Sequence, residues 1–247
     1  MQPYFFQLQV ETWSRNSVNL IQKAQLQFII FPRVERPASI YGSYGKTVNG
    51  VFKPGLLHVL RETFFDKYVE HIRSGTPVKK SIWFFKKEED IADINDYLCE
   101  CLPDCSADPA TCPWVVNFSS VGPATALSIR NREGEISLYL TTAVMLMGIN
   151  LQNIQIIGMV RPFGSIHSIV QASGRGGRNT GEKERQKVVC FLLFNKSDIG
   201  ENIDVSQSVR NLCLTENCLK RTMMEYFGTE GCCGDSWCCS NCDLKAG

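Results

Sequence analysis

The sequence lacks the features that would place it in a membrane or direct it out of the cell. No run of apolar residues approaches the roughly 18 that a membrane-spanning helix needs. The opening residues carry Glu11 and no basic leader followed by a continuous apolar stretch, so they do not resemble a secretory signal. We therefore expect no membrane partner and an intracellular, reducing compartment. Clustered cysteines in such a compartment are metal ligands more often than disulfides.

An excess of charge of one sign is also missing. The 247 residues include 26 Lys and Arg against 25 Asp and Glu, a formal net charge of +1. Because no protein-wide positive field attracts phosphates, a nucleic-acid partner would have to be held by a local basic strip. The residues that offer one are Lys183, Arg185 and Lys187, close to two further arginines. The apolar fraction of 44% is ordinary for a globular protein and excludes a disordered or fibrous chain.

Short apolar runs alternate with helix-compatible segments through the middle of the chain. Apolar residues at helical spacing predict one helix over 57–72 and another over 91–101. The runs that read as buried strands are 81–85, 114–118, 136–140, 154–160 and 188–194. This alternation predicts an α/β fold, a parallel sheet with helices on both faces, in which ligands bind beyond the carboxyl ends of the strands. The strand pattern stops near residue 199, and helices are expected after it.

The sharpest motif is the run from Gln171 to Arg178, at the end of a short helical stretch over 165–172. Arg175 and Arg178 lie three residues apart among glycines. On a rigid turn they could aim two guanidinium groups at phosphate oxygens, for which arginine is the preferred side chain. A flexible basic loop is the alternative, because glycine and arginine also occur together in disordered nucleic-acid-binding segments.

Cysteines crowd the end of the chain, where five of the twelve lie between residues 232 and 242. A Cys-x-x-Cys turn such as Cys239 to Cys242 presents two thiolates to a tetrahedral zinc ion. For a further ligand we favour Cys233, with Cys232 next, over Cys238, which adjoins a ligand and is expected to point elsewhere. Buried or redox-active thiols are the alternative. A second group has suggestive spacing but lies among prolines, so a second zinc is not expected at Cys99, Cys101, Cys105 and Cys112.

These motifs together resemble a known family. The run 171–178 resembles the Q-x-x-G-R-x-G-R signature of superfamily 2 helicases, in which the final arginine is an arginine finger. The segment 141–150, TTAVMLMGIN, lies where that family has A-T-x-A-x-G-M-G-I-D. Residues 218–221, 226–228 and 239–243 resemble the C-R-R, Y-F-G and C-x-N-C-D elements of RecQ helicases. The resemblance covers roughly residues 55–247.

The resemblance implies a RecA-like helicase lobe over residues 33–198 and a small helical zinc-binding module over 199–247, with 1–32 unassigned. It implies DNA as partner, 3′ to 5′ unwinding driven by ATP and Mg²⁺, and a role in DNA repair or recombination in the nucleus. Arg175 and Arg178 would meet the nucleotide phosphates. Residues coupling nucleotide to DNA would be Gln171, Gly174, Gly177, Gly148 and Asn150. The implied zinc ligands are Cys218, Cys239, Cys242 and Cys233, with Cys232 as the alternative to Cys233.

Three positions depart from the family pattern. Leu146 stands where the family usually has Gly, Asn150 where it has Asp, and Ala172 where it has Glu. Because a carboxylate at position 150 could order arginines near the nucleotide, its loss favours weak coupling to ATP.

A first helicase lobe, which would bind ATP through a glycine-rich loop and an acidic motif, is not evident. Gly45-Lys46-Thr47 matches the end of such a loop, but Ile40 replaces its first glycine, so we expect an ordinary turn there. The chain alone is therefore predicted to be inactive unless a separate ATP-binding lobe is supplied. The competing hypotheses are a non-enzymatic module that binds DNA or a partner through the basic strip and zinc tail, and a gene fragment.

Overall fold

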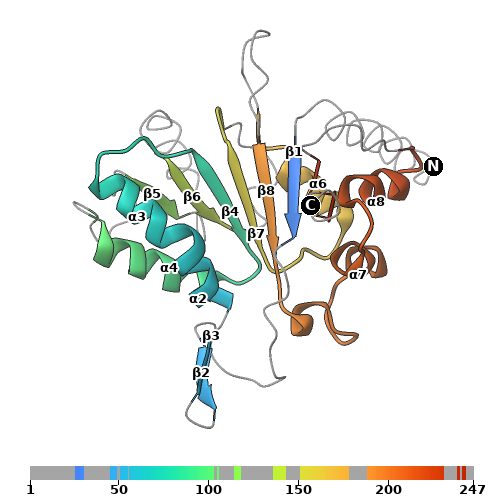
Figure 1. Cartoon of the computed structure of the whole chain (residues 1–247), viewed down its shortest axis with the longest axis horizontal. Coiled ribbons are helices and arrows are strands. Elements are labelled where there is room, and N and C mark those ends of the chain that lie inside the picture. Colours follow the sequence, from blue (N-terminus) through green and yellow to red (C-terminus); the bar gives the residue numbers. More distant parts are fainter. Residues whose placement is uncertain are drawn as a thin grey trace, which may run out of the picture.

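The computed structural model of the chain describes residues 26–30, 45–48, 51–54, 56–102, 105, 114–117, 136–142, 151–177, 188–230, 238–239 and 241–242. Its centre is a six-stranded sheet in the order β1-β8-β7-β4-β6-β5 (Figure 1). Each neighbouring pair of strands runs parallel. The predicted α/β class is confirmed.

The strands begin and end close to the apolar runs that predicted them. They are β1 (Leu26–Ile30), β4 (Ser81–Phe85), β5 (Val115–Asn117), β6 (Leu138–Thr141), β7 (Ile156–Val160) and β8 (Val188–Leu193). All five predicted strands are confirmed within two residues at each end. Strand β1 was not predicted. It pairs with β8 at the sheet edge, so the sheet starts before the expected lobe boundary at residue 33.

The helices fall where helical periodicity indicated. They are α2 (Leu56–Leu60), the π-helical turn η1 (Arg61–Phe65), α3 (Asp66–Arg73), α4 (Glu88–Cys101), α6 (Ile166–Ser173), the 3-10 turn η3 (Lys196–Ile199), α7 (Gln207–Leu214) and α8 (Leu219–Tyr226). Both residues flanking η1 have helical backbone angles, so α2, η1 and α3 form one continuous helix. None of the described helices combines the length and apolar character that a membrane crossing requires.

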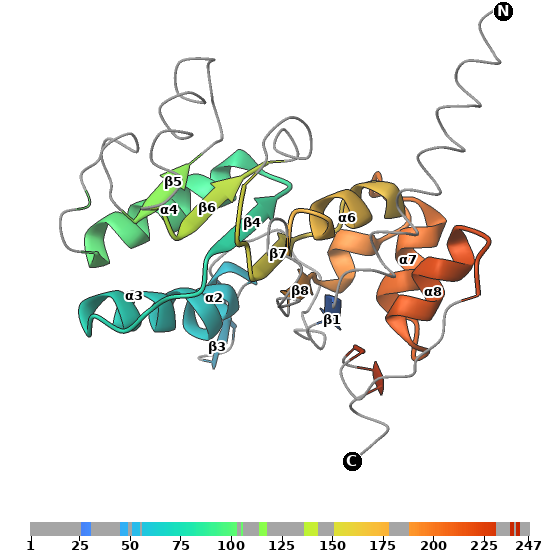
Figure 2. The ribbon, with the colours of Figure 1, turned by 90° about the horizontal axis from the view of Figure 1, so that it is seen from above.

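Two apolar cores flank the sheet, because successive side chains of a strand point to opposite faces. Ile82 and Phe84 of β4 join the core that α6, α7 and α8 cover, whereas Trp83 and Phe85 join the core under α2, α3 and α4. Figure 2 separates the two groups of helices. Gly158 of β7 leaves room for the Trp83 ring, since a Cβ there would come within 1.9 Å of Trp83 Cε3.

The helices after residue 199 have no separate core among the described residues. Val209 of α7, Met223 of α8 and Cys239 belong to the same buried cluster as Ile82 and Phe84 of the sheet. The expected boundary near residue 199 therefore marks a change in sequence pattern and not a gap in packing.

A small antiparallel hairpin contains the Gly45-Lys46-Thr47 motif. Strands β2 (Gly45–Val48) and β3 (Val51–Pro54) pair with Lys46 opposite Lys53. The expectation of an ordinary turn at residues 45–47 is wrong, because the segment is extended. A phosphate-binding loop instead wraps between a strand and the helix that follows it. The geometry excludes these residues as such a loop.

Candidate functional site

The glycine-rich turn after α6 is fixed by its own backbone. The amide of Gly174 donates to Val170 O at 2.8 Å, that of Arg175 to Ala172 O at 3.0 Å, and that of Gly176 to Ser173 O at 3.2 Å. The amide of Gly177 donates to Ile154 O, just before β7, at 3.1 Å. Four consecutive donors are thus satisfied, as buried backbone requires.

Two of these glycines have a physical reason to be glycine. A Cβ at Gly176 would lie 2.4 Å from Val188 Cγ1 and 2.9 Å from Ile157 Cδ1, so only glycine lets the turn approach the sheet this closely. Gly177 has φ 66°, in the left-handed region that glycine tolerates without strain. Residues 174–177 of the motif therefore form a rigid turn, and the flexible-loop interpretation does not hold for them.

The turn lies at the amino ends of β7 and β8, beside Ile154 and Val188. We expected ligand chemistry at the opposite edge, beyond the carboxyl ends of the strands. The reason for the difference is that α6 follows β7 and returns the chain to the edge where β7 began. The hydrogen bond to Ile154 also connects this turn to the residues that follow the 141–150 segment.

The predicted site residues divide into described and undescribed ones. Arg175 is 7% exposed, so its guanidinium is packed inside the turn region in this state, and Gln171 is half-buried. The predicted residues that lie outside the described ones are Arg178, Gly148, Asn150, Lys183, Arg185, Lys187, Cys232 and Cys233. Their roles stay predictions.

A buried ion-pair network that the sequence did not reveal lies at the carboxyl edge of the sheet. Arg161, directly after β7, donates from Nε to Asp90 Oδ2 at 2.9 Å and from Nη1 to Asp198 Oδ1 at 2.6 Å. Burial lowers the pKa of Arg161, but the hydrogen bonds and charges of the two carboxylates outweigh it and raise that pKa. Arg161 follows β7 directly, and Asp198 lies in η3, which follows the neighbouring strand β8. Charged residues beyond two predicted strands were thus the signal in the sequence that could have indicated this ion pair.

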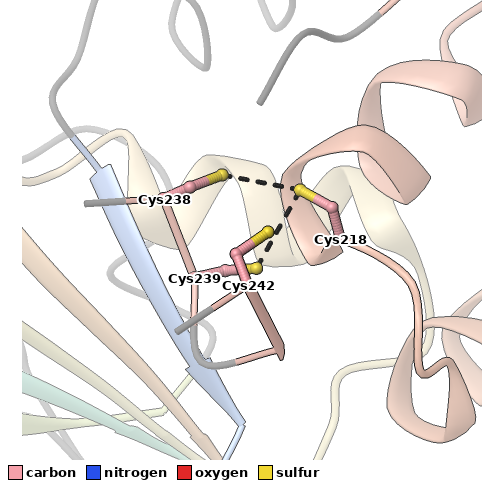
Figure 3. A group of neighbouring side chains, drawn as sticks. All are labelled: Cys218, Cys238, Cys239 and Cys242. Carbon is pink, nitrogen blue, oxygen red and sulfur yellow. Dashed lines mark hydrogen bonds between the residues drawn. The ribbon is translucent and has the colours of Figure 1, made fainter. Parts of the chain in front are cut away.

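Four cysteine sulfurs form a candidate metal centre (Figure 3). The sulfurs of Cys218, Cys238, Cys239 and Cys242 all lie within 4.8 Å of one another. Cys218 Sγ is 3.5 Å from Cys238 Sγ and 3.9 Å from Cys239 Sγ. Thiolates about 2.3 Å from a tetrahedral zinc ion are roughly 3.8 Å apart. The arrangement could hold a metal ion, and four soft sulfur donors suit zinc.

Cys238 belongs to this cluster, so the expectation that its side chain points elsewhere is wrong. Adjacent side chains point apart in an extended strand, but the chain bends at Cys238, and both Cys238 and Cys239 face Cys218. Both are buried, at 4% and 0% exposure. Cys233 and Cys232, the predicted fourth ligands, lie outside the described residues, so their role stays a prediction.

Hydrogen bonds hold the Cys-x-x-Cys turn against the loop between α7 and α8. Asn241 Nδ2 donates to Thr215 O at 2.9 Å and to Asn217 O at 2.8 Å. The amide of Arg221, in the first turn of α8, donates to Cys218 Sγ at 3.4 Å. The pKa of Cys242 is raised to about 12 by burial and by the neighbouring Cys239 and Cys218 sulfurs. A bound cation would offset this crowding of sulfurs by stabilising the thiolates.

Comparison with known proteins gives one weak sequence match. No protein-family model matches the chain. The ATP-dependent DNA helicase RecQ of Bacillus subtilis (strain 168) is 28% identical over 131 residues, which are 45% of this chain and 21% of that protein. The aligned part thus spans about a fifth of its relative. The match supports a helicase-like C-terminal lobe and does not single out the RecQ type.

Solved structures, two helicases among them, are similar to this chain at low TM-scores. The DUF1998 helicase MrfA bound to DNA matches at TM-score 0.47 and 16% identity, over 74% of this chain and 22% of that chain. The Mycobacterium smegmatis helicase Lhr bound to ssDNA and AMP-PNP matches at TM-score 0.44 and 14% identity, over 71% and 20%. S. cerevisiae Dbp5 bound to RNA and ADP BeF3 matches at TM-score 0.43 and 12% identity, over 70% and 36%. At these TM-scores the similarity supports no statement about function.

Proposed function

We propose that this chain is the C-terminal portion of an ATP-dependent DNA helicase of RecQ type, comprising the second RecA-like lobe and the zinc-binding module. ATP and Mg²⁺ would be bound by a first lobe, encoded with this chain or supplied by another. The rigid Gly174–Gly177 turn carries the proposal, because an arginine finger needs a fixed backbone that delivers it to a phosphate.

Arg178 is the proposed finger. It follows Gly177 directly, so a turn held by four backbone hydrogen bonds fixes the chain that leads into it. A finger stabilises charge on the transferred phosphoryl group, an effect worth roughly 10³–10⁵ in rate. Because Arg175 is 7% exposed, we assign it first to the packing of the turn. It would reach phosphate only if lobe closure released it.

The remaining residues of the two motifs would couple nucleotide state to DNA. The hydrogen bond from Gly177 to Ile154 supports this proposal, because it links the turn to the chain that follows the 141–150 segment. The residues proposed for coupling are Gln171, Gly174, Gly177, Gly148 and Asn150. Asn150 lacks the charge of the family's aspartate, so we expect slow turnover even in a complete enzyme.

The zinc module would stabilise the tail that α7 and α8 begin. We propose Cys218, Cys239 and Cys242 as ligands with Cys238 as the fourth, on the distances between their sulfurs. Cys233, with Cys232 as its alternative, is the fourth ligand that the resemblance implies, and metal analysis of variants separates the two assignments.

DNA would be held near the basic strip of Lys183, Arg185 and Lys187. With a net charge of +1, the chain can neutralise only the few phosphates that the strip reaches, so binding should be weak and salt-sensitive. A role in DNA repair or recombination, in the nucleus or elsewhere inside the cell, would follow from the family resemblance. The competing proposal is a DNA- or partner-binding module without catalysis, which the same strip and the zinc tail would serve.

The test adds an ATP-binding first lobe to this chain. A RecQ-type first lobe, fused or added in trans, should produce DNA-stimulated ATP hydrolysis, which Arg178→Ala should reduce by about 10³ or more. Arg178→Lys should be nearly as slow, because lysine lacks the guanidinium fork. Lys53→Ala, a loss of equal charge in the hairpin, is the control and should leave the rate unchanged. If Arg178→Ala leaves the rate of ATP hydrolysis unchanged, Arg178 is not an arginine finger. If the chain binds DNA but no hydrolysis appears, the non-enzymatic module is favoured.

A further inference from the structure

A pair of cysteines near the end of α4 is separate from the four-cysteine cluster and lies far from it along the chain. Cys99 Sγ and Cys105 Sγ are 3.2 Å apart, within hydrogen-bonding distance for two thiols. The helix ends at Cys101, and Leu102, 5% exposed, closes it by donating its amide to Leu98 O at 2.8 Å. Leu102 is thus anchored in the core, and Cys105, which follows it closely in the sequence, has its sulfur against that of Cys99.

In the part of the chain that the structure describes, this group has two sulfurs, whereas a structural metal site takes four ligands. Within the described residues, no third metal-ligating side chain joins Cys99 and Cys105. Cys101 belongs to a different face of α4, because it lines an open groove with Tyr97 and Asp66. Its backbone is also held there, since Arg73 donates from Nη2 to Cys101 O at 2.7 Å. Cys99 and Cys105 thus form a group apart from Cys101, the cysteine that lies between them in the sequence.

Asn95 distinguishes the two sulfurs. Its Nδ2 donates to Cys99 Sγ at 3.8 Å, from one turn earlier on α4, and Asn95 is itself only 9% exposed. An N–H donor directed at sulfur favours the thiolate over the thiol, and the thiolate is the nucleophile in disulfide exchange. Cys99 therefore has the better environment to attack an oxidant, and Cys105 is placed to resolve the product.

We propose that Cys99 and Cys105 form a reversible redox site that is oxidised to an intramolecular disulfide by a low-molecular-weight disulfide such as glutathione disulfide. The Cys99 thiolate attacks the oxidant, forms a mixed disulfide and releases one glutathione thiolate. The Cys105 thiolate then attacks Cys99 Sγ and releases the second. Two protein thiols are oxidised, one glutathione disulfide is reduced to two glutathiones, and the two protein protons end on glutathione. A dithiol reductant reverses the change.

The disulfide would tether Cys105 to the last turn of α4. Cys99 and Cys105 are both half-buried, which leaves the pair open to a small oxidant, whereas Cys190 and Cys213 are buried among apolar residues. Burial raises the pKa of each of those two thiols to about 12, which keeps them protonated and unreactive. They serve as internal controls for selective oxidation.

The experiment uses the full chain, purified with zinc. The protein is equilibrated with glutathione disulfide and glutathione at graded ratios, free thiols are alkylated, and the chain is cut at lysine, arginine, glutamate and aspartate. Cleavage after Asp96, Glu100 and Asp104 puts Cys99, Cys101 and Cys105 on separate peptides. Because the Asp108–Pro109 bond resists cleavage, Cys105 and Cys112 share one peptide, and Cys112→Ser resolves them.

We expect a cross-link between the peptide 97–100 and the peptide that begins at Cys105, at ratios that leave Cys190 and Cys213 fully alkylated. Cys105→Ser should abolish the cross-link and leave glutathione on Cys99. Cys101→Ser and Cys112→Ser should keep it, and circular dichroism checks that each variant folds. Asn95→Ala should slow alkylation of Cys99 several-fold without changing that of Cys101.

Three outcomes overturn the proposal: a cross-link that survives in Cys105→Ser, a cross-link that requires Cys112, and oxidation of Cys190 or Cys213 at ratios that leave Cys99 reduced. Because the site uses neither the glycine-rich turn nor the tail, its failure leaves the proposed helicase function unaffected. Failure of the ATPase test likewise leaves the proposed redox site at Cys99 and Cys105 unaffected.

Discussion

Arg161 Nη1 donates to Asp198 Oδ1 at 2.6 Å and so joins the end of β7 to η3, the turn that follows β8. The same guanidinium reaches Asp90 in the first turn of α4. Arg161 has φ 70°, a left-handed backbone that is unfavourable for a residue with a side chain. Its amide donates to Leu193 O at 2.8 Å, so the backbone and side chain of Arg161 both hold this conformation. The network thus holds the carboxyl edge of the sheet to the first turn of α4 and to η3.

Asp198→Ala should destabilise the protein by about 3–5 kcal/mol, because it leaves part of a buried guanidinium without its carboxylate. Asp198 Oδ2 also accepts from the amide of Asn195 at 2.7 Å, so the start of η3 should loosen. The measurement is the free energy of unfolding in urea. Asp204→Ala, an exposed aspartate in the following loop, is the control and should change it by less than about 0.5 kcal/mol. Equal effects of the two variants would contradict the role of the network.

Gly176→Ala should lower the free energy of unfolding by about 1–3 kcal/mol, the usual range for overpacking a close contact. The added methyl group would meet Val188 and Ile157 at 2.4 and 2.9 Å, and the turn would have to move away from the sheet. Gly164→Ala is the matched control, because a Cβ there meets its nearest atom, Asp204 O, at 3.8 Å. If the two variants unfold at the same urea concentration, the turn is not packed as described.

The sequence predicted where most strands lie but not which strands pair with each other. Short apolar runs predicted β4, β5, β6, β7 and β8, because each strand shows its apolar character in its own composition; β4 and β6 are buried along their whole length. Strand β1 has the apolar run Phe28–Ile30, but its partner β8 lies far along the chain, and no local pattern records that pairing. The hairpin was not predicted for a related reason. Residues 45–47 match the end of a phosphate-binding loop, and nothing in that short motif indicates that the segment pairs with Val51–Pro54.

The candidate site shows the same limit. Spacing identified Cys239 and Cys242, but the choice of Cys233 over Cys238 depended on side-chain directions that only the bend at Cys238 decides. Similarly, the run 171–178 named both arginines without showing that Arg175 is buried. Residue type and spacing thus predicted which groups gather, and the tertiary contacts determined which way each one faces.

The tail should carry one zinc ion per chain. Structural zinc sites in small modules have apparent binding energies of about 10–16 kcal/mol, so a chelator should lower the thermal stability of the chain. Elemental analysis of the purified protein measures the metal. Cys238→Ser should lose zinc if the four clustered sulfurs are the ligands, whereas Cys233→Ser should lose it if the family assignment holds. Cys101→Ser, outside both sets, should retain it. A zinc-free wild-type protein would contradict both assignments.

The two arginines of the glycine-rich turn should differ in what their loss changes. Arg175 is 7% exposed, so Arg175→Ala removes a packed side chain and should destabilise the chain by about 1–3 kcal/mol in urea unfolding. Arg178→Ala should leave that free energy within about 0.5 kcal/mol of the wild type, because a finger acts on the bound nucleotide and not on the fold. In an enzyme completed with a first lobe, Arg178→Ala should cost most of the ATPase rate. Arg175→Lys should keep more of that rate than Arg178→Lys, since only the finger depends on guanidinium geometry at the phosphate. If instead Arg178→Ala destabilises the chain and Arg175→Ala leaves stability unchanged while abolishing hydrolysis, the roles assigned here are reversed.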